Sequence, residues 1–273
     1  MYIQLIDGLH RKEFKISFFV VFLLSIIAFC IECSEFYGSS MNFVRGADEV
    51  NIMNGISGVN LVLTLVMPLV SGLIYASSYV DEKASGLFRY IVTRKKIEKY
   101  LWEKAAVVFL LNFFTFLLPI LLNIFLCKLF FPAVNYSNMY GMPAFSGWLN
   151  YYPRQYADIL RVKYEFWYTL LLTFNTCLFS GLIGMVIFGI LFLVKKNKYK
   201  VIAGFYVIFL FLEILCETQD LWSIEIFSYC MPMSYGNWWM QGILIMIWLG
   251  SGLFLIQLGI QKEKSRMELS DEH

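Results

Sequence analysis

Positive charges alternate from loop to loop along this chain, and no other feature of the sequence constrains the fold as strongly. Long apolar runs divide the chain, and the loops between them are by turns rich and poor in lysine and arginine. Of the 22 lysine and arginine residues, 17 lie in four basic segments: Arg11, Lys12 and Lys15; Lys83, Arg89, Arg94, Lys95, Lys96, Lys99 and Lys104; Lys195, Lys196, Lys198 and Lys200; and Lys262, Lys264 and Arg266. The other loops hold Arg45, Arg154, Arg161 and Lys163, and Lys128 lies inside an apolar run. Because loops rich in lysine and arginine stay on the cytoplasmic side of a membrane, the pattern predicts six spans with both termini in the cytoplasm.

The apolar runs are long enough for this topology. Hydrophobic residues make up 59% of the chain, against roughly 45–50% in soluble domains, and a helix needs roughly 20 apolar residues to cross a bilayer. The expected spans are residues 16–31, 59–80, 105–131, 166–194, 201–216 and 239–260. The fifth is the weakest because Glu213 interrupts it. We therefore predict an all-α polytopic membrane protein that forms a single domain over residues 1–273.

Two segments outside the spans have patterns of their own. In residues 1–14, Tyr2, Leu5, Ile6 and Leu9 share one helical face, which predicts an amphipathic helix lying in the membrane interface. Residues 132–165 form a long outer loop rich in aromatic residues, which suit the level of the lipid headgroups.

Residues 81–104, between the second and third spans, carry the strongest local pattern. Leu87, Tyr90 and Ile91 share one face of a short helix, and Thr93 is placed to cap a second helix that runs into the third span. Such a surface helix can dock into a groove on a soluble partner. An ordinary amphipathic connector explains the same spacing equally well, so spacing alone leaves both interpretations open.

This segment resembles the membrane permease subunits of type-2 ABC exporters, which carry a Glu-x-x-x-Gly element followed by an arginine. Glu82, Gly86, Arg94 and Lys104 match that pattern. The motif covers residues 81–104, and the architecture of an interfacial helix followed by six spans extends the resemblance over the whole chain. The resemblance implies a cytoplasmic coupling helix that contacts a separate ABC ATPase, with ATP and magnesium bound by that ATPase. It also implies a second copy of this permease, or a related permease, in membrane lipid.

The resemblance also implies which residues couple to the ATPase. The coupling residues are Glu82, Gly86, Leu87, Tyr90, Ile91, Arg94 and Lys104. Glu82 is expected to pair with a basic group or cap a helix start, Gly86 to permit a tight turn, and Arg94 to reach a carboxylate. We expect substitutions of Glu82, Gly86 or Arg94 to leave folding nearly intact, because these sites lie outside the apolar runs. The outer loop 132–165 is longer than the outer segment 217–238, unlike the usual pattern of these permeases, and this leaves the substrate open.

Motifs of other function classes are absent from the sequence. There is no G-x-x-x-x-G-K-[ST], H-E-x-x-H or G-x-S-x-G sequence, so we expect no nucleotide site and no catalytic residues in this chain. With only two histidines and no paired C-x-x-C sequences, a metal site is not expected. Attraction to anionic lipid explains the basic loops, and nucleic acid is not an expected partner.

Two functional interpretations remain. The first is an exporter permease for an amphipathic substrate such as a peptide, an antibiotic or a lipid. The second is a non-transporting membrane sensor or immunity protein that docks a cytoplasmic partner through the same loop. An ion-coupled secondary transporter would require inverted repeats or acidic residues at mid-membrane, and the sequence shows neither.

Polar residues within the spans have a structural explanation. Lys128 and Glu213 lie near outer ends, and we expect both to snorkel toward the interface. Three asparagines are expected to form hydrogen bonds between helices: Asn112, Asn123 and Asn175. Ser180 and Gly184 form a small-xxx-small pair for close helix packing. Among the six cysteines, an extracytoplasmic disulfide and simple apolar packing both remain open.

Overall fold

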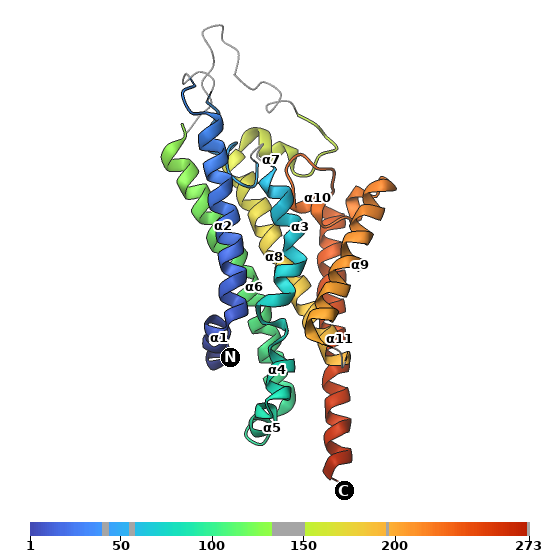
Figure 1. The fold of residues 1–273 in the computed structure, drawn as a ribbon. Coiled ribbons are helices and arrows are strands. Elements are labelled where there is room, and N and C mark those ends of the chain that lie inside the picture. Colours follow the sequence, from blue (N-terminus) through green and yellow to red (C-terminus); the bar gives the residue numbers. More distant parts are fainter. Residues whose placement is uncertain (40–43, 55–57, 133–150, 195–196, 272–273) are drawn as a thin grey trace.

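The computed structural model describes residues 1–39, 44–54, 58–132, 151–194 and 197–271, and within these ranges the chain is helical, with no β-strand (Figure 1). Six helices in the described residues are long and apolar enough to cross a membrane: Lys12–Glu35, Val59–Ala84, Ile97–Phe130, Glu165–Leu193, Lys198–Thr218 and Trp238–Ser265. The prediction of an all-helical protein with six such helices is confirmed. Most of loop 132–165, including residues 133–150, lies outside the described residues.

The helices follow one another in a simple order. They are α1 (Tyr2–His10), α2 (Lys12–Glu35), α3 (Val59–Ser71), the π-helical turn η2 (Gly72–Ala76), α4 (Ser78–Ala84), α5 (Leu87–Val92), α6 (Ile97–Phe130), α7 (Asp158–Lys163), α8 (Glu165–Leu193), α9 (Lys198–Thr218), the 3-10 turn η4 (Trp222–Ile224), α10 (Phe227–Cys230) and α11 (Trp238–Asp271). Figure 1 shows the long helices side by side, with α1, α4, α5 and the C-terminal part of α11 at one end. We call this the basic end, because described residues of all four basic segments lie there. The opposite end carries α7, η4 and α10.

Two helix boundaries differ from the predictions. The first helix ends at His10 rather than at residue 14, because Arg11 adopts an extended conformation and α2 begins at Lys12. The third long helix begins at Ile97, and Thr93 does not cap it. Instead, the Thr93 hydroxyl donates to the carbonyl of Tyr90 at 2.8 Å, so Thr93 closes α5 rather than starting α6.

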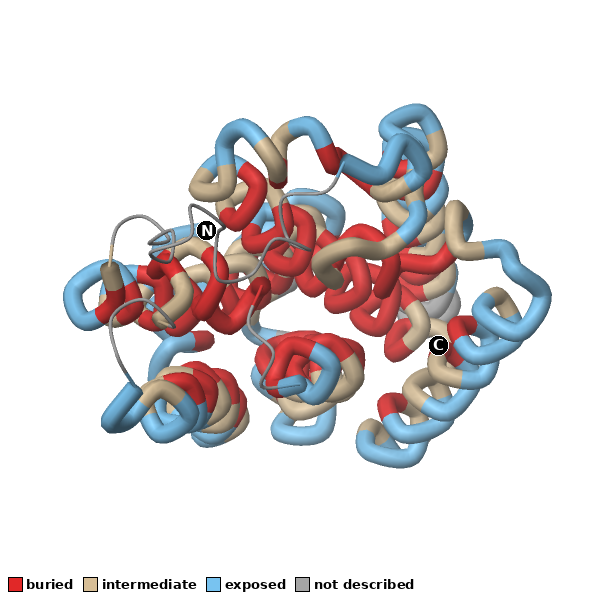
Figure 2. The backbone as a smooth tube through the Cα atoms, turned by 90° about the horizontal axis from the view of Figure 1, so that it is seen from above, coloured by how far each residue is buried: buried red, intermediate tan, exposed pale blue. Residues whose placement is uncertain are grey.

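Helix α8 lies in the middle of the bundle (Figure 1), and the view from above shows that buried residues gather in the middle of the molecule (Figure 2). In the most apolar stretch of α8, 83% of the residues are buried, against 17% for α9. Small residues allow this packing, since a Cβ at Gly184 would lie 2.4 Å from the side chain of Asn112 on α6. A Cβ at Gly189 would lie 2.6 Å from Leu255 Cβ on α11. The prediction that small residues in this span permit close helix contacts is confirmed.

Buried amides connect separate parts of the bundle. Asn123 on α6 donates to the carbonyl of Ser25 on α2 at 2.8 Å, and its Oδ1 accepts from the backbone of Ile52 at 2.8 Å. Asn175 on α8 accepts a hydrogen bond through its Oδ1 from Nε2 of Gln241 on α11 at 2.7 Å. These two fulfil the expected interhelical role. Asn112 donates only within α6, to Val108.

The structure corrects the expectation of snorkelling for Glu213. Glu213 is buried, and its carboxylate accepts from the backbone N–H groups of Ile226 and Phe227 at the start of α10, at 3.3 Å each. Lys128 pairs with Asp48 at 3.3 Å and lies 3.8 Å above the ring of Phe166. Backbone N–H groups of the protein therefore satisfy the Glu213 carboxylate. Lys128 has a partner in Asp48, but its side chain is 41% exposed, so its snorkelling stays a prediction. The six cysteines are all free, so no disulfide forms.

Glu225, next to α10, gives a pH-dependent prediction for the opposite end. Burial raises the pKa of its carboxyl, with a further contribution from Glu217, and the 3.0 Å hydrogen bond from Ser228 only partly offsets this. A carboxyl whose pKa is higher in the folded state stabilises the fold below that pKa, and the contribution is lost as the pH rises through it. We expect Glu225→Gln to raise the thermal midpoint at pH 7 and to have no such effect at pH 4. Asp220→Asn, at an exposed site, is the control, and an equal gain from both variants would contradict the role of burial.

Orientation in the membrane is a second testable expectation. Arg94 follows α5, which lies at the basic end, and Asp220 follows the C-terminal end of α9 at the opposite end (Figure 1). In a background in which Cys30, Cys33 and Cys216 are serine, Arg94→Cys should react only with a membrane-permeant thiol reagent in intact cells, and Asp220→Cys also with an impermeant one. Impermeant labelling of Arg94→Cys would reverse the assigned orientation.

Candidate functional site

The site at the basic end is built on a tight turn between α4 and α5. The backbone N–H of Ser85 donates to Asp81 at 2.9 Å, and Gly86 then adopts φ +77°. Left-handed backbone is costly for residues with a Cβ. A Cβ at Gly86 would meet nothing within 4 Å, so the backbone angle, rather than a lack of space, accounts for the glycine. The expected tight turn at Gly86 is present.

A buried ion pair ties α4 to α6 beneath this turn. The Nζ of Lys104 lies 2.5 Å from Oε1 of Glu82, and the hydroxyl of Tyr100 donates to Oε2 of Glu82 at 2.6 Å. Lys104 is fully buried and Glu82 is 8% exposed. The ammonium also lies 5.3 Å from the ring centre of Tyr75, a favourable arrangement for a cation. Because charges that are removed from water must be paired, this contact fixes the distance between the two helices.

Asp81, beside Glu82, pairs with two basic residues from other parts of the chain. It accepts from Arg11 at 3.1 Å and from Lys198 at 2.7 and 2.9 Å. Arg11 also pairs with Asp7 at 3.3 Å, and Asp7 accepts from the Tyr75 hydroxyl at 3.2 Å. Burial alone would lower the pKa of Arg11, but the neighbouring Asp7, Tyr75 and Asp81 outweigh burial and raise it. The guanidinium therefore stays charged, and it links α1 to α4.

Two further ion pairs attach the C-terminal part of α11 to the same assembly. Lys83 on α4 pairs with Glu263 at 2.5 Å, and Lys264 pairs with Glu98 on α6. The pair of Lys264 and Glu98 is exposed and contributes little stability by itself, whereas Glu263 is buried. Together with the buried pair, they connect α4, α6 and α11 at the basic end.

No family model, curated protein or solved structure matches the chain.

The structure divides the predicted coupling residues into two groups. Glu82 and Lys104 lie in the buried base, where Glu82 makes the expected pair with a basic group. Leu87, Tyr90 and Arg94 are exposed on α5 and the turn after it, and the side chain of Arg94 forms no ion pair with any described residue. The expectation that substitutions leave folding intact is therefore revised for Glu82, because its burial and its partner make it part of the core. Ile91 is half-buried.

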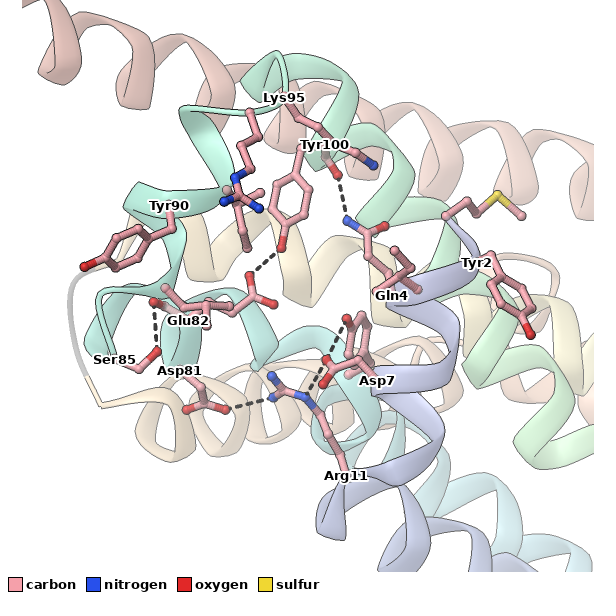
Figure 3. A pocket seen from close by; sticks show the side chains of 16 residues that line it. Tyr2, Gln4, Asp7, Arg11, Asp81, Glu82, Ser85, Tyr90, Lys95 and Tyr100 are labelled. Atoms are coloured by element: carbon pink, nitrogen blue, oxygen red, sulfur yellow. Dashed lines mark hydrogen bonds and ion pairs between the residues drawn. The ribbon is translucent and has the colours of Figure 1, made fainter.

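A cavity of about 990 Å³ separates α1 from α4 and α5 (Figure 3). Its walls include predicted residues such as Glu82 and Tyr90, and also Gln4, Arg11 and Tyr75, which the sequence analysis did not single out. A pairing of Asp7 with Arg11, four residues apart, was the one available sequence signal for this wall. No group of three or more His, Cys, Asp or Glu side chains within the described ranges could hold a metal ion. The chemistry of this site is that of ion pairs, aromatic rings and hydrogen-bonding groups.

Proposed function

We propose that this chain is the transmembrane permease subunit of an ATP-driven ABC exporter in the cell membrane, with both termini in the cytoplasm. In this proposal α5 and its flanking turns form the coupling element that contacts a separate ATPase, which binds ATP and magnesium. A second copy of the chain, or a related permease, completes the pathway. The substrate class is an amphipathic molecule such as a peptide, an antibiotic or a lipid.

The observation that carries the proposal is the contrast between the two parts of the segment 81–104. Its base is held by the buried pair of Glu82 and Lys104, whereas Tyr90, near its tip, is 77% exposed. Large apolar and aromatic side chains exposed outside apolar spans are typical of protein interaction sites. A mechanical coupling element requires a tip that is available to a partner. It also requires a base that is fixed to a long apolar helix.

The connections from the base suggest how motion would spread. ATP binding would close the ATPase pair and displace α5. The pair of Glu82 and Lys104 would pass this displacement to α6, and Asp81 would pass it to α1 and α9 through Arg11 and Lys198. Rigid elements joined by charged contacts are able to carry such coupling.

Isolation of the partner tests the proposal directly. The tagged chain, purified from membranes of its native cell, should retain a nucleotide-binding subunit and show ATP hydrolysis. Tyr90→Ala and Leu87→Ala should each weaken retention of that subunit by about 10-fold or more, as expected for central aromatic and apolar anchors. Both side chains are exposed, so thermal midpoints should stay within about 1 °C of the parent chain.

Tyr199→Ala is the matched control. Tyr199 is also an exposed tyrosine at the basic end, but it lies on α9, and its removal should leave retention unchanged. The chain could instead retain a partner that does not bind nucleotide, and the two variants could lose that partner. This result would support the sensor or immunity interpretation. Full retention in Tyr90→Ala and Leu87→Ala would contradict a docking role for α5.

A further inference from the structure

Residues 44–54, between α2 and α3, fold into the bundle at the opposite end. The segment contains no helix, yet seven of its side chains are at most 4% exposed: Ala47, Glu49, Val50, Asn51, Ile52, Met53 and Asn54. Irregular segments usually run over the surface, because their backbone groups need hydrogen-bond partners that the interior rarely supplies. Burial of this segment therefore requires partners from the surrounding helices.

The segment reaches below the ends of those helices. The backbone N–H of Ile52 donates to Oδ1 of Asn123 on α6 at 2.8 Å. Asn123 precedes Phe130, the last residue of α6, by seven residues, a depth of about 10 Å at roughly 1.5 Å per residue. Inside a membrane, non-helical backbone is tolerated only where protein buries it or where it lines a water-filled cavity. If the segment left this position, water rather than lipid would replace it.

Polar side chains of the neighbouring helices hold the segment. Oγ1 of Thr169 on α8 accepts from Asn54 at 2.6 Å and from Asn51 at 3.3 Å. On α3, Nδ2 of Asn60 donates to a carbonyl of the segment at 3.0 Å. Thr169, Asn60 and Asn123 are each at most 5% exposed, so they form a polar wall behind the segment. Water is able to replace each of these hydrogen bonds, so the wall can be hydrated when the segment is displaced.

Glycines with left-handed backbone lie on both sides of the segment. Gly38 follows α2 with φ +77°, and Gly58 precedes α3 with φ +66°. A Cβ at either position would meet nothing within 4 Å, so the backbone angle, rather than crowding, accounts for both glycines. Glycine adopts positive and negative φ about equally readily. Each position can therefore act as a joint about which the segment turns while α2 and α3 stay helical.

The segment also covers a buried cysteine. Cys127 on α6 is 0% exposed and belongs to one buried cluster with Ala47 and Val50. Its Sγ lies 3.9 Å from the carbonyl oxygen of Val50. Cys177 is equally buried, but it lies eight residues further along α8 than Thr169, about 12 Å deeper in the bundle. Displacement of the segment would expose Cys127, whereas exposure of Cys177 requires the helices to separate.

We infer that residues 44–54 form a movable plug that closes a polar-walled vestibule between α3, α6 and α8. The plug withdraws about Gly38 and Gly58 while the helices stay folded. Water then enters the space lined by Asn60, Asn123 and Thr169. This motion belongs to the chain itself, and it depends neither on an ATPase nor on which end of the bundle is cytoplasmic.

Thiol labelling of the purified full chain, without an ATPase, tests the plug. The folded chain would be kept with a water-soluble maleimide for hours, and peptide mass spectrometry would follow each cysteine separately. We expect Cys127 to react at least about 10-fold faster than Cys177, because local opening requires less free energy than separation of core helices. Thr169→Val keeps the side-chain shape but removes the acceptor that Asn51 and Asn54 share. It should accelerate Cys127 by about a further 10-fold and leave Cys177 unchanged.

Thr173→Val is the matched control. Thr173 lies one turn further along α8 and is 1% exposed, and its hydroxyl donates to the backbone carbonyl of Thr169 rather than to the plug. This variant should change neither labelling rate.

Three results would reject the plug. Cys127 could react as slowly as Cys177 in the parent chain, which would make the segment a fixed part of the core. Fast labelling of Cys127 that Thr169→Val does not change would assign the opening to the end of α6. Equal acceleration of Cys127 and Cys177 would show that the whole bundle opens. If Thr169→Val does not fold, the comparison of the two cysteines in the parent chain decides.

Discussion

Replacing Lys104 by methionine is expected to lower the free energy of unfolding by about 3–5 kcal/mol, the usual cost of breaking a buried ion pair. Methionine preserves the length and apolar character of the side chain, but it leaves the carboxylate of Glu82 buried with only the Tyr100 hydroxyl as a partner. The thermal midpoint should fall by on the order of 10 °C. A thiol-reactive dye would report unfolding, because Cys127, Cys177 and Cys230 are buried and free in the folded chain.

Two further variants make this result specific. Lys99→Met removes an exposed lysine from the same helix and should change the midpoint little. Glu82→Gln combined with Lys104→Met removes both charges and keeps an acceptor for Tyr100, so it should recover most of the lost stability. A double variant as unstable as Lys104→Met would show that the pairing of the charges is not the origin of the effect.

Gly189→Ala is expected to lower the free energy of unfolding by about 1–3 kcal/mol, the usual cost of overpacking. The added methyl group would lie 2.6 Å from Leu255 Cβ and 3.3 Å from the backbone nitrogen of Ile256. A Cβ atom is fixed to its backbone, so relief requires α8 and α11 to move apart. The same dye assay would measure the change.

Gly204→Ala in α9 is the matched control, because a Cβ there meets nothing within 4 Å. In a helix interior, alanine is preferred over glycine by roughly 0.5–1 kcal/mol, so this variant should melt slightly higher than the parent. If the same substitution lowers stability at Gly189 and raises it at Gly204, the loss at Gly189 arises from the contact between α8 and α11. Similar changes at both sites would contradict the close approach of α8 and α11.

The helices could be predicted from the sequence because the information for them is local. The length of an apolar run and the number of lysines in the next loop are properties of neighbouring residues, and these gave six helices of sufficient length. Helix boundaries were less accurate, because the alternatives differ by single contacts. Thr93 satisfies the general pattern of a helix cap, yet its hydroxyl bonds backward to Tyr90.

The candidate site was only partly predictable, because its contacts join distant residues. Glu82 and Lys104 were identified, but their burial as a pair depends on the turn at Gly86 and on where α6 begins. Asp81 and Lys198 are 117 residues apart, and no local pattern relates them. Glu213 was misjudged for the same reason, since its partners belong to α10 and approach it only in the folded bundle.

The π-helical turn Gly72–Ala76 lies in the run Val59–Ala84, between the apolar part of that run and Glu82, the acidic member of the buried pair. Hydrogen bonds in a π-turn span one residue more than those of an α-helix, so this turn accommodates one extra residue without altering the direction in which the following side chains point. Each α-helical residue otherwise advances the direction by about 100°. A homologous chain one residue shorter at this point would therefore form a continuous α-helix and still direct Glu82 at Lys104. In a sequence alignment, a single gap at residues 72–76 is compatible with the same ion pair.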